Sequence, residues 1–116
     1  MKMSPAEEEY TKKVAIEKIE MSRAENFLHQ EVTTLSAELY NGGSERVSAV
    51  MLTTEFSDGM NQIVLRETRQ VLGISSPSLA PGERRPFDIS FEHVPDSWNM
   101  QAPAVRVSQL QLPRKQ

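Results

Sequence analysis

A chain of 116 residues, 38% hydrophobic and 25% charged, has the size and composition of one folded domain. The absence of cysteine excludes disulfide bonds, thiol catalysis and thiolate metal sites. A net charge of −3 argues against nucleic-acid binding, and the short basic pairs Arg84-Arg85 and Arg114-Lys115 do not change that. The longest apolar run, Ala49 to Leu52, is far shorter than the roughly 20 residues of a membrane helix, so we expect no direct membrane insertion.

The first thirty residues allow two interpretations. Residues 6–26 are rich in alanine, glutamate and lysine, which by propensity alone favours a helix. The apolar stripe of that helix would consist of Tyr10, Val14, Met21, Ala24 and Leu28. The alternative is a strand over Lys13–Ser22 that contains one change of phase, between Ile16 and Ile19. In either case residues 1–12 form a helical or disordered lead-in, and residues 13–116 form the domain itself.

From Glu31 onward the residues alternate with a period of two, which predicts β-strands. One face of the first strand consists of Thr33, Leu35, Ala37 and Leu39. Asn41-Gly42-Gly43 then predicts a tight hairpin turn, because these residue types tolerate positive φ angles. In the next run, Val47 to Phe56, one face consists of Val50, Leu52, Thr54 and Phe56. Val47 is out of step with that face, which predicts a bulge at Ser48-Ala49.

The remaining strands follow at similar spacing. Asp58-Gly59-Met60-Asn61 predicts a second hairpin turn, and a strand over Gln62 to Leu72 follows it. After a long connection, Gly73 to Gly82, the most regular strand has an apolar face of Phe87, Ile89 and Phe91. A last strand, Ala104 to Leu112, contains another change of phase. Short strands joined by hairpins and turn-rich connections predict an all-β, antiparallel sandwich.

Residues that could carry catalysis are few. His29 lies in a predicted loop and His93 follows the most regular strand, and neither has the spacing of a zinc site. We expect both to be surface or strand-end residues. No serine lies in a nucleophile elbow, and Glu7-Glu8-Glu9 is a solvated charge run. We therefore predict a protein that is not an enzyme and has no cofactor, with no catalytic or cofactor-binding residues.

Two further features suggest sites in the turns. Asp58, together with Glu55 and Asn61, could form a weak calcium site, although the ligand density is low. Asp96 is a candidate N-cap for one helical turn that would fold Trp98 over the end of the core. Trp98 is thus expected to be a structural residue, with a binding hot spot as the alternative.

Four segments, in order, carry a family resemblance: Leu35 to Gly43, Val47 to Gly59, Leu79 to Glu83, and Phe87 to Asn99. Together they resemble small bacterial domains of unknown function related to the FxLYD-type extracellular domains. The resemblance spans roughly Lys13 to Leu112. It implies an immunoglobulin-like β-sandwich of about six to seven strands, and it favours the strand for Lys13–Ser22.

The resemblance also implies display outside the cytoplasmic membrane, behind an anchor or signal that would precede this chain; a cytoplasmic location is the alternative. We expect a structural or protein-binding module whose protein partner is not identified, because a partner can add a strand to an exposed sheet edge. The strand around Val14 is the expected edge, and it also makes a homodimer an option. Two alternatives stay open: a protease inhibitor acting through Gly73–Gly82, and a weak metal-binding or enzymatic domain.

Overall fold

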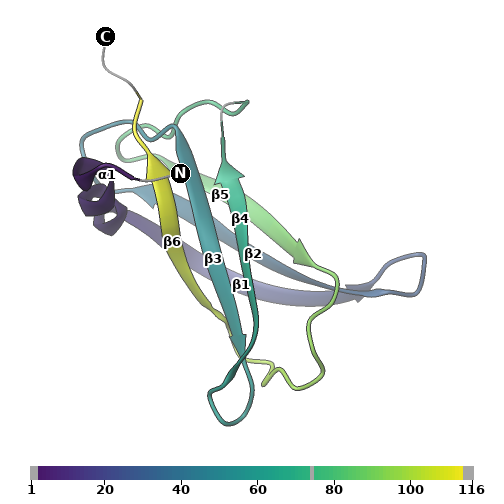
Figure 1. Cartoon of the computed structure of the whole chain (residues 1–116). Helices are drawn as coiled ribbons and strands as arrows, with labels where there is room; N and C mark the ends of the chain where they lie inside the picture. Colours follow the sequence, from purple (N-terminus) through teal and green to yellow (C-terminus); the bar gives the residue numbers. More distant parts are fainter. Residues whose placement is uncertain (1–2, 74, 114–116) are drawn as a thin grey trace.

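Two three-stranded antiparallel sheets face each other in the computed structural model, which describes residues 3–73 and 75–113 (Figure 1). The first sheet has the order β1-β2-β5, with bounds Val14–Glu25, Glu31–Asn41 and Arg84–Phe91. The second has the order β4-β3-β6, with bounds Ile63–Leu72, Ala49–Ser57 and Ala104–Gln111. The predicted all-β antiparallel sandwich is confirmed. A few positions named in the sequence analysis lie outside the described residues: Ile74, the basic pair Arg114-Lys115, and residues 1, 2 and 116 at the ends of the predicted lead-in and domain.

The lead-in is helical. α1 (Pro5–Tyr10) begins with a capping box, in which Ser4 Oγ accepts a hydrogen bond from the backbone N–H of Glu7 (3.2 Å) and Glu7 Oε1 accepts one from the Ser4 N–H (2.9 Å). Pro5 is well placed in the first turn because its missing N–H would have no partner there. A 3₁₀ turn, η1 (Thr11–Lys13), leads into β1.

The strand interpretation of Lys13–Ser22 is correct in type, but the strand begins one residue later, at Val14, and ends three residues later, at Glu25. The continuous helix is wrong. The predicted change of phase is a bulge, where the pairing of β1 with β2 shifts between Glu17 and Glu20. Lys18 lies inside this bulge with a φ angle of 55°. Long-range pairing with β2 therefore outweighs the helical propensity of the alanine, glutamate and lysine residues.

The hairpin predicted at Asn41-Gly42-Gly43 is wrong, because the chain crosses there from one sheet to the other. Neither glycine has a positive φ angle. Gly43 is instead required by a close approach, since a Cβ atom on it would lie 2.7 Å from Cζ of Tyr10. A glycine pair thus marks a place where a buried ring passes the backbone.

Asn41 ties this crossing to the rest of the molecule and is fully buried. Its Nδ2 donates to the carbonyl oxygens of Glu45 (2.7 Å) and Leu79 (3.1 Å). Its Oδ1 accepts hydrogen bonds from the Tyr10 hydroxyl (2.7 Å) and the Gly43 N–H (3.2 Å). We call these five residues the Asn41 network. It joins α1, the β2–β3 crossing and the β4–β5 connection.

The bulge predicted at Ser48-Ala49 is also wrong. Val47 precedes β3 and forms an isolated bridge with Leu79, which explains why it is buried yet out of step with the strand. The register shifts nearest to this position lie on either side of Met51, and the extra residue stands in the neighbouring strand each time, Val71 in β4 and Ser108 in β6. The predicted turn at Asp58 is confirmed by a hydrogen bond from the Asp58 N–H to the Gln62 carbonyl oxygen (2.9 Å).

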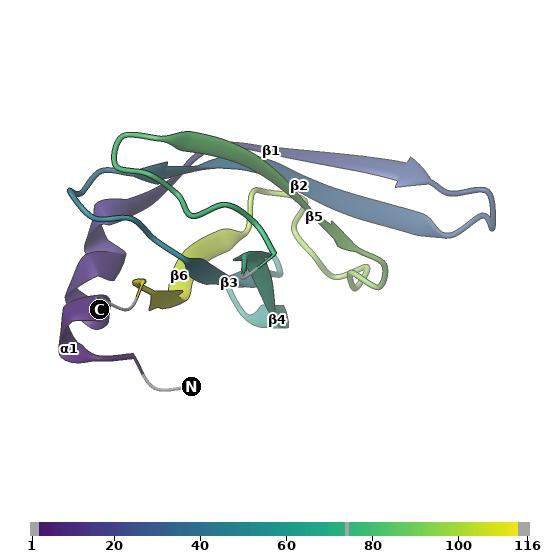
Figure 2. The same ribbon diagram turned by 90° about the horizontal axis from the view of Figure 1, so that it is seen from above.

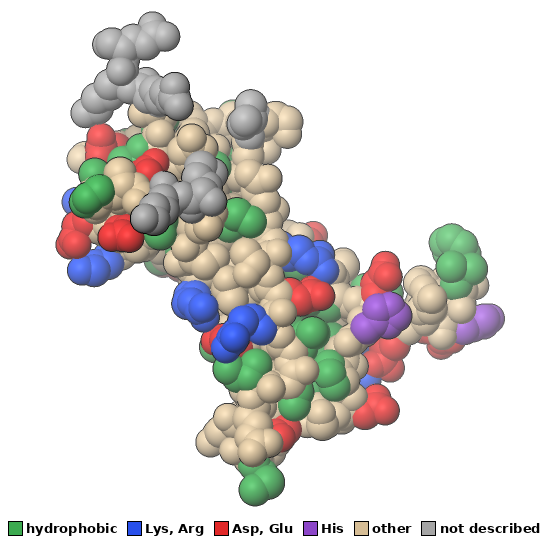
Figure 3. Space-filling model, in the orientation of Figure 1, with side chains coloured by type: hydrophobic (Ala, Val, Ile, Leu, Met, Phe, Trp, Pro, Cys, Tyr) green, Lys and Arg blue, Asp and Glu red, His purple; other side chains and the backbone are tan. Residues whose placement is uncertain are grey.

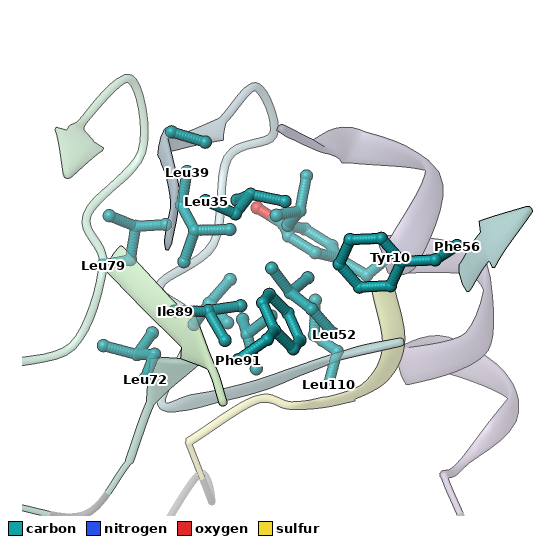
Figure 4. Packing of buried hydrophobic residues seen from close by; sticks show 14 of the residues in the cluster. Tyr10, Leu35, Leu39, Leu52, Phe56, Leu72, Leu79, Ile89, Phe91 and Leu110 are labelled. Carbon is teal, nitrogen blue, oxygen red and sulfur yellow. The ribbon is translucent and has the colours of Figure 1, made fainter. Parts of the chain in front are cut away.

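The core lies between the inner faces of the sheets (Figures 2 and 4). Its fully buried large side chains are Phe56, Phe91, Leu35, Leu39, Leu52, Leu72 and Leu79. The Phe56 and Phe91 rings meet edge to face, with centroids 5.0 Å apart. Thr54, predicted on the inner face, is 1% exposed, and its hydroxyl has no hydrogen-bond partner among the described residues. That buried hydroxyl costs stability.

Gly43→Ala should destabilise the protein by about 1–3 kcal/mol, because the new Cβ overlaps the Tyr10 ring. Gly59→Ala is the matched control, since nothing lies within 4 Å of a Cβ at that position. We expect it to change stability by less than about 0.5 kcal/mol. Urea unfolding of the three proteins measures both values, and equal stabilities would contradict the close approach.

Thr54→Val should stabilise the protein by about 1 kcal/mol, because it removes an unpaired buried hydroxyl while keeping the side-chain shape. The neighbouring Thr53 provides the opposite case, since its hydroxyl bonds to that of Thr68 at 2.8 Å. Thr53→Val should therefore lower stability. Thermal melting of both variants tests the contrast, which fails if the two shift the melting temperature in the same direction.

Candidate functional site

Three of the four sheet edges carry features that discourage pairing with another chain. Free edges expose unpaired backbone groups, and proteins protect them with bulges, proline and charged side chains. β1 has its bulge at Lys18. β5 contains Pro86, with two arginines before it and Asp88 after it. β4 carries Arg66, Glu67 and Arg69. The strand around Val14 is an edge, as predicted, but it is a protected one.

β6 is the fourth edge. Its N-terminal half, residues 104–107, contains no bulge and no proline, and a bulge follows at Ser108, where the pairing with β3 shifts. Within the described residues it pairs only with β3, on one side. Arg106 is its one charged residue, and the guanidinium Nη1 lies 3.0 Å from Glu55 Oε1. Val105 and Val107 pack against the core and are half-buried, and no strand among the described residues covers the outer side of β6. The edge therefore offers both backbone groups and apolar side chains.

α1 covers one end of this edge. The Leu112 N–H, just after β6, donates to Glu7 Oε2 at 2.9 Å. Figure 1 shows α1 beside the C-terminal end of β6. No strand of the part of the chain that the structure describes runs along the outer side of β6. The backbone N–H groups of Ser4 and Leu112 hold the pKa of Glu7 below its ordinary value of 4.5. The accessible part of the edge is thus its N-terminal half, residues 104–107.

Trp98 is a core residue, as the structural interpretation predicts. It is 6% exposed, its ring meets Phe56 edge to face at 5.2 Å, and its Nε1 donates to the Gln101 carbonyl oxygen at 3.0 Å. The predicted helical turn is wrong, because Asp96 lies inside a β-turn closed by a hydrogen bond from the Trp98 N–H to the Pro95 carbonyl oxygen. A tight turn can therefore anchor the ring without a helix or an N-cap.

Both histidines are exposed. His29 lies at the tip of the β1–β2 hairpin with a φ angle of 61°, and its Nδ1 is 2.9 Å from Glu25 Oε1. His93 follows β5 in the connection that leads to Trp98. These positions agree with the predicted surface and strand-end roles.

The three residues of the predicted weak calcium site, Asp58, Glu55 and Asn61, have other roles in the structure. Asp58 Oδ1 accepts two backbone N–H groups of its own turn. Glu55 pairs with Arg66 and Arg106, and hydrogen bonding to Arg66 is the main reason that the pKa of Glu55 lies below its ordinary value. Asn61 supplies the positive φ angle of the turn. Among the described residues, no three His, Cys, Asp or Glu side chains are grouped to hold a metal ion.

The connection proposed as an inhibitory loop is anchored along much of its length. Leu79 is fully buried, and its N–H and carbonyl groups pair with those of Val47. Arg85 Nη2 donates to the Ser78 carbonyl oxygen at 3.1 Å. Only residues 75–77 and the turn at Pro81-Gly82 are exposed among its described residues, so the stretch that could enter a protease is short.

Comparison with protein-family models, curated proteins and solved structures finds no match for this chain. No helix among the described residues is long and apolar enough to span a membrane.

Glu7→Gln should weaken the pH dependence of stability. Because the folded pKa of Glu7 is lowered, its carboxylate stabilises the protein above pH 4.5, and this contribution disappears as the pH falls through the folded pKa. The free energy of unfolding should thus decrease less steeply between about pH 5 and pH 3 in the variant. Glu8→Gln is the control for loss of one charge in α1. Urea titrations at each pH test this, and an unchanged slope for Glu7→Gln would contradict the contact with Leu112.

Proposed function

We propose that this chain is a non-enzymatic protein-binding module that receives an extended segment of a partner protein along the N-terminal half of β6. The observation that carries the proposal is the unprotected edge at residues 104–107, next to three protected ones. Strand addition to a free edge is a common mode of peptide recognition, in which backbone hydrogen bonds supply affinity and alternate side chains supply specificity.

The strand order supports an immunoglobulin-like fold. In such sandwiches the first, second and fifth strands of the chain share a sheet, and the third strand pairs with the sixth. β1-β2-β5 and the pairing of β3 with β6 follow this order. A seventh strand of such a fold would pair with the outer side of β6. The proposed partner segment would therefore take a position that the fold already provides.

The chemistry of the partner segment follows from the residues that it would cover. It must place apolar side chains beside Val105 and Val107, which are half-buried on the inner face. It needs no charged partner there, because Arg106 is already paired with Glu55. An alternating apolar and polar strand meets these requirements, and a second copy of this chain could supply it from its own β6.

The resemblance to FxLYD-type domains supports display on the outer side of a bacterial membrane. In that location a protein that binds by strand addition would meet other envelope proteins. We therefore expect its partner to be one of these proteins.

Site-specific photo-crosslinking tests the proposal. A photoreactive residue at Ala104, at the exposed start of the β6 edge, should give a crosslinked product with one envelope protein or with a second copy. The matched control places the same residue at Met60, which is 80% exposed on the β3–β4 turn and should give none.

Competition makes the test specific for the edge. Excess unlabelled protein should abolish the Ala104 product, whereas the Val105→Lys variant should compete at least about tenfold less well, because an inward-pointing charge protects an edge. Circular dichroism confirms first that the variant is folded. Equal products from Ala104 and Met60, or equal competition by both proteins, would contradict strand addition at β6.

A further inference from the structure

The β1–β2 hairpin projects beyond the rest of the sandwich (Figures 1 and 2). β5 accompanies β2 only as far as Thr33, opposite Phe91, so residues 24–32 have no third strand beside them. Three hollows of about 530, 280 and 120 Å³ lie along this hairpin, and all three include Glu31 in their walls. The first is lined by hairpin residues alone, and the other two lie between the hairpin and the connection from β5 to β6. We call the three hollows together the hairpin groove.

The hairpin groove is acidic. Its charged walls consist of Glu25, Glu31, Glu92, Asp96 and Arg23. Four carboxylates against one guanidinium give the groove a charge of −3 with neutral histidines. Figure 3 shows acidic and histidine side chains gathered along the projecting hairpin and the segment near its base.

Two of these carboxylates are available to a ligand. Glu31 forms an ion pair with Arg23, and Glu25 lies 2.9 Å from His29. Glu92 and Asp96 form no ion pair and no side-chain hydrogen bond with any other described residue. An acidic groove with unpaired carboxylates attracts cations and repels anionic surfaces.

Thr33 gives a second and independent indication of a ligand. It is 2% exposed, its side chain lines two of the three hollows, and its hydroxyl has no hydrogen-bond partner among the described residues. The hydroxyl is not one of the fully enclosed side-chain atoms that lack a partner, so it faces the hollows, where a ligand can form a hydrogen bond with it.

Apolar side chains accompany the charges. Phe27 and Leu28 at the hairpin tip are 92% and 65% exposed, and Met100, which lines the groove, is 55% exposed. Trp98 closes the bottom of the same hollow. A small metal ion would use none of these surfaces, whereas a peptide chain with mixed side chains would use both the charges and the apolar contacts.

We propose that the hairpin groove binds an extended, positively charged peptide segment of a partner protein. Lysine or arginine side chains of that segment lie against Glu92 and Asp96, and its apolar side chains contact Met100 and the hairpin tip. This site is separate from the edge of β6 and does not depend on strand addition there.

Titration of the ¹⁵N-labelled chain with two synthetic peptides tests the proposal. The first is a blocked nine-residue peptide in which lysine alternates with leucine, and the second has glutamate in place of every lysine. The lysine peptide should cause saturable shifts of amide resonances in residues 23–33 and 92–100, and the glutamate peptide should cause none. The site fails if both peptides bind equally, or if neither gives saturable shifts up to about 2 mM, far beyond the affinity of useful peptide recognition.

Paired variants locate the charges. Glu92→Gln with Asp96→Asn should weaken binding of the lysine peptide about tenfold, since it removes two charge contacts of ordinary strength. Glu20→Gln with Asp88→Asn is the matched control, because it removes the same charge from exposed positions outside the groove. Equal weakening by both pairs would overturn the proposal in favour of a general charge effect.

Thr33→Val separates the ligand contact from folding. The variant should leave the melting temperature of the free protein nearly unchanged, because the hydroxyl bonds to no other described residue, and yet lower the affinity for the lysine peptide. Shifts confined to β6 would support strand addition and overturn the groove site. A final titration uses calcium chloride. If calcium causes saturable shifts near the same carboxylates and the peptide does not, the groove binds a metal ion and the peptide proposal is wrong.

Discussion

The sandwich depends on one buried amide. Asn41 is fully buried at the point where the chain leaves the first sheet, and its hydrogen bonds reach Tyr10, Glu45 and Leu79. Because each of these groups is removed from water, any one left without its partner would carry the cost of its desolvation. The network therefore fixes α1, the crossing and the β4–β5 connection together. By holding α1 in place, it also determines how much of β6 is covered.

The sequence pattern predicts the strands well, since inward and outward residues alternate wherever one face of a strand meets the core. The face made of Val50, Leu52, Thr54 and Phe56, and the phase change in β1, are both found in the structure. The connections were harder to predict. Asn-Gly-Gly has the composition of a hairpin turn, but here the amide and the glycine serve long-range contacts with Tyr10. Local propensity contains no information on such contacts.

The candidate sites were the least predictable part. The edge of β6 stands out only when its neighbours in the sheet are known, because a strand with few charges is ordinary inside a sheet and unusual at an edge. The hairpin groove brings together residues 23–33 and 92–100, which no spacing in the sequence connects. Trp98 was identified from its isolation in a turn, and its position confirms the structural role.

The long sequence separations within the Asn41 network have a kinetic consequence. Tyr10 and Asn41 are 31 residues apart, and Asn41 and Leu79 are 38 apart, so both loops must close before the amide is fully bonded. Closing long loops costs entropy before any contact compensates for it, and such topologies fold slowly. During synthesis, Asn41 emerges well before Leu79. The hydrogen bonds of the crossing therefore cannot all form until Leu79 has left the ribosome.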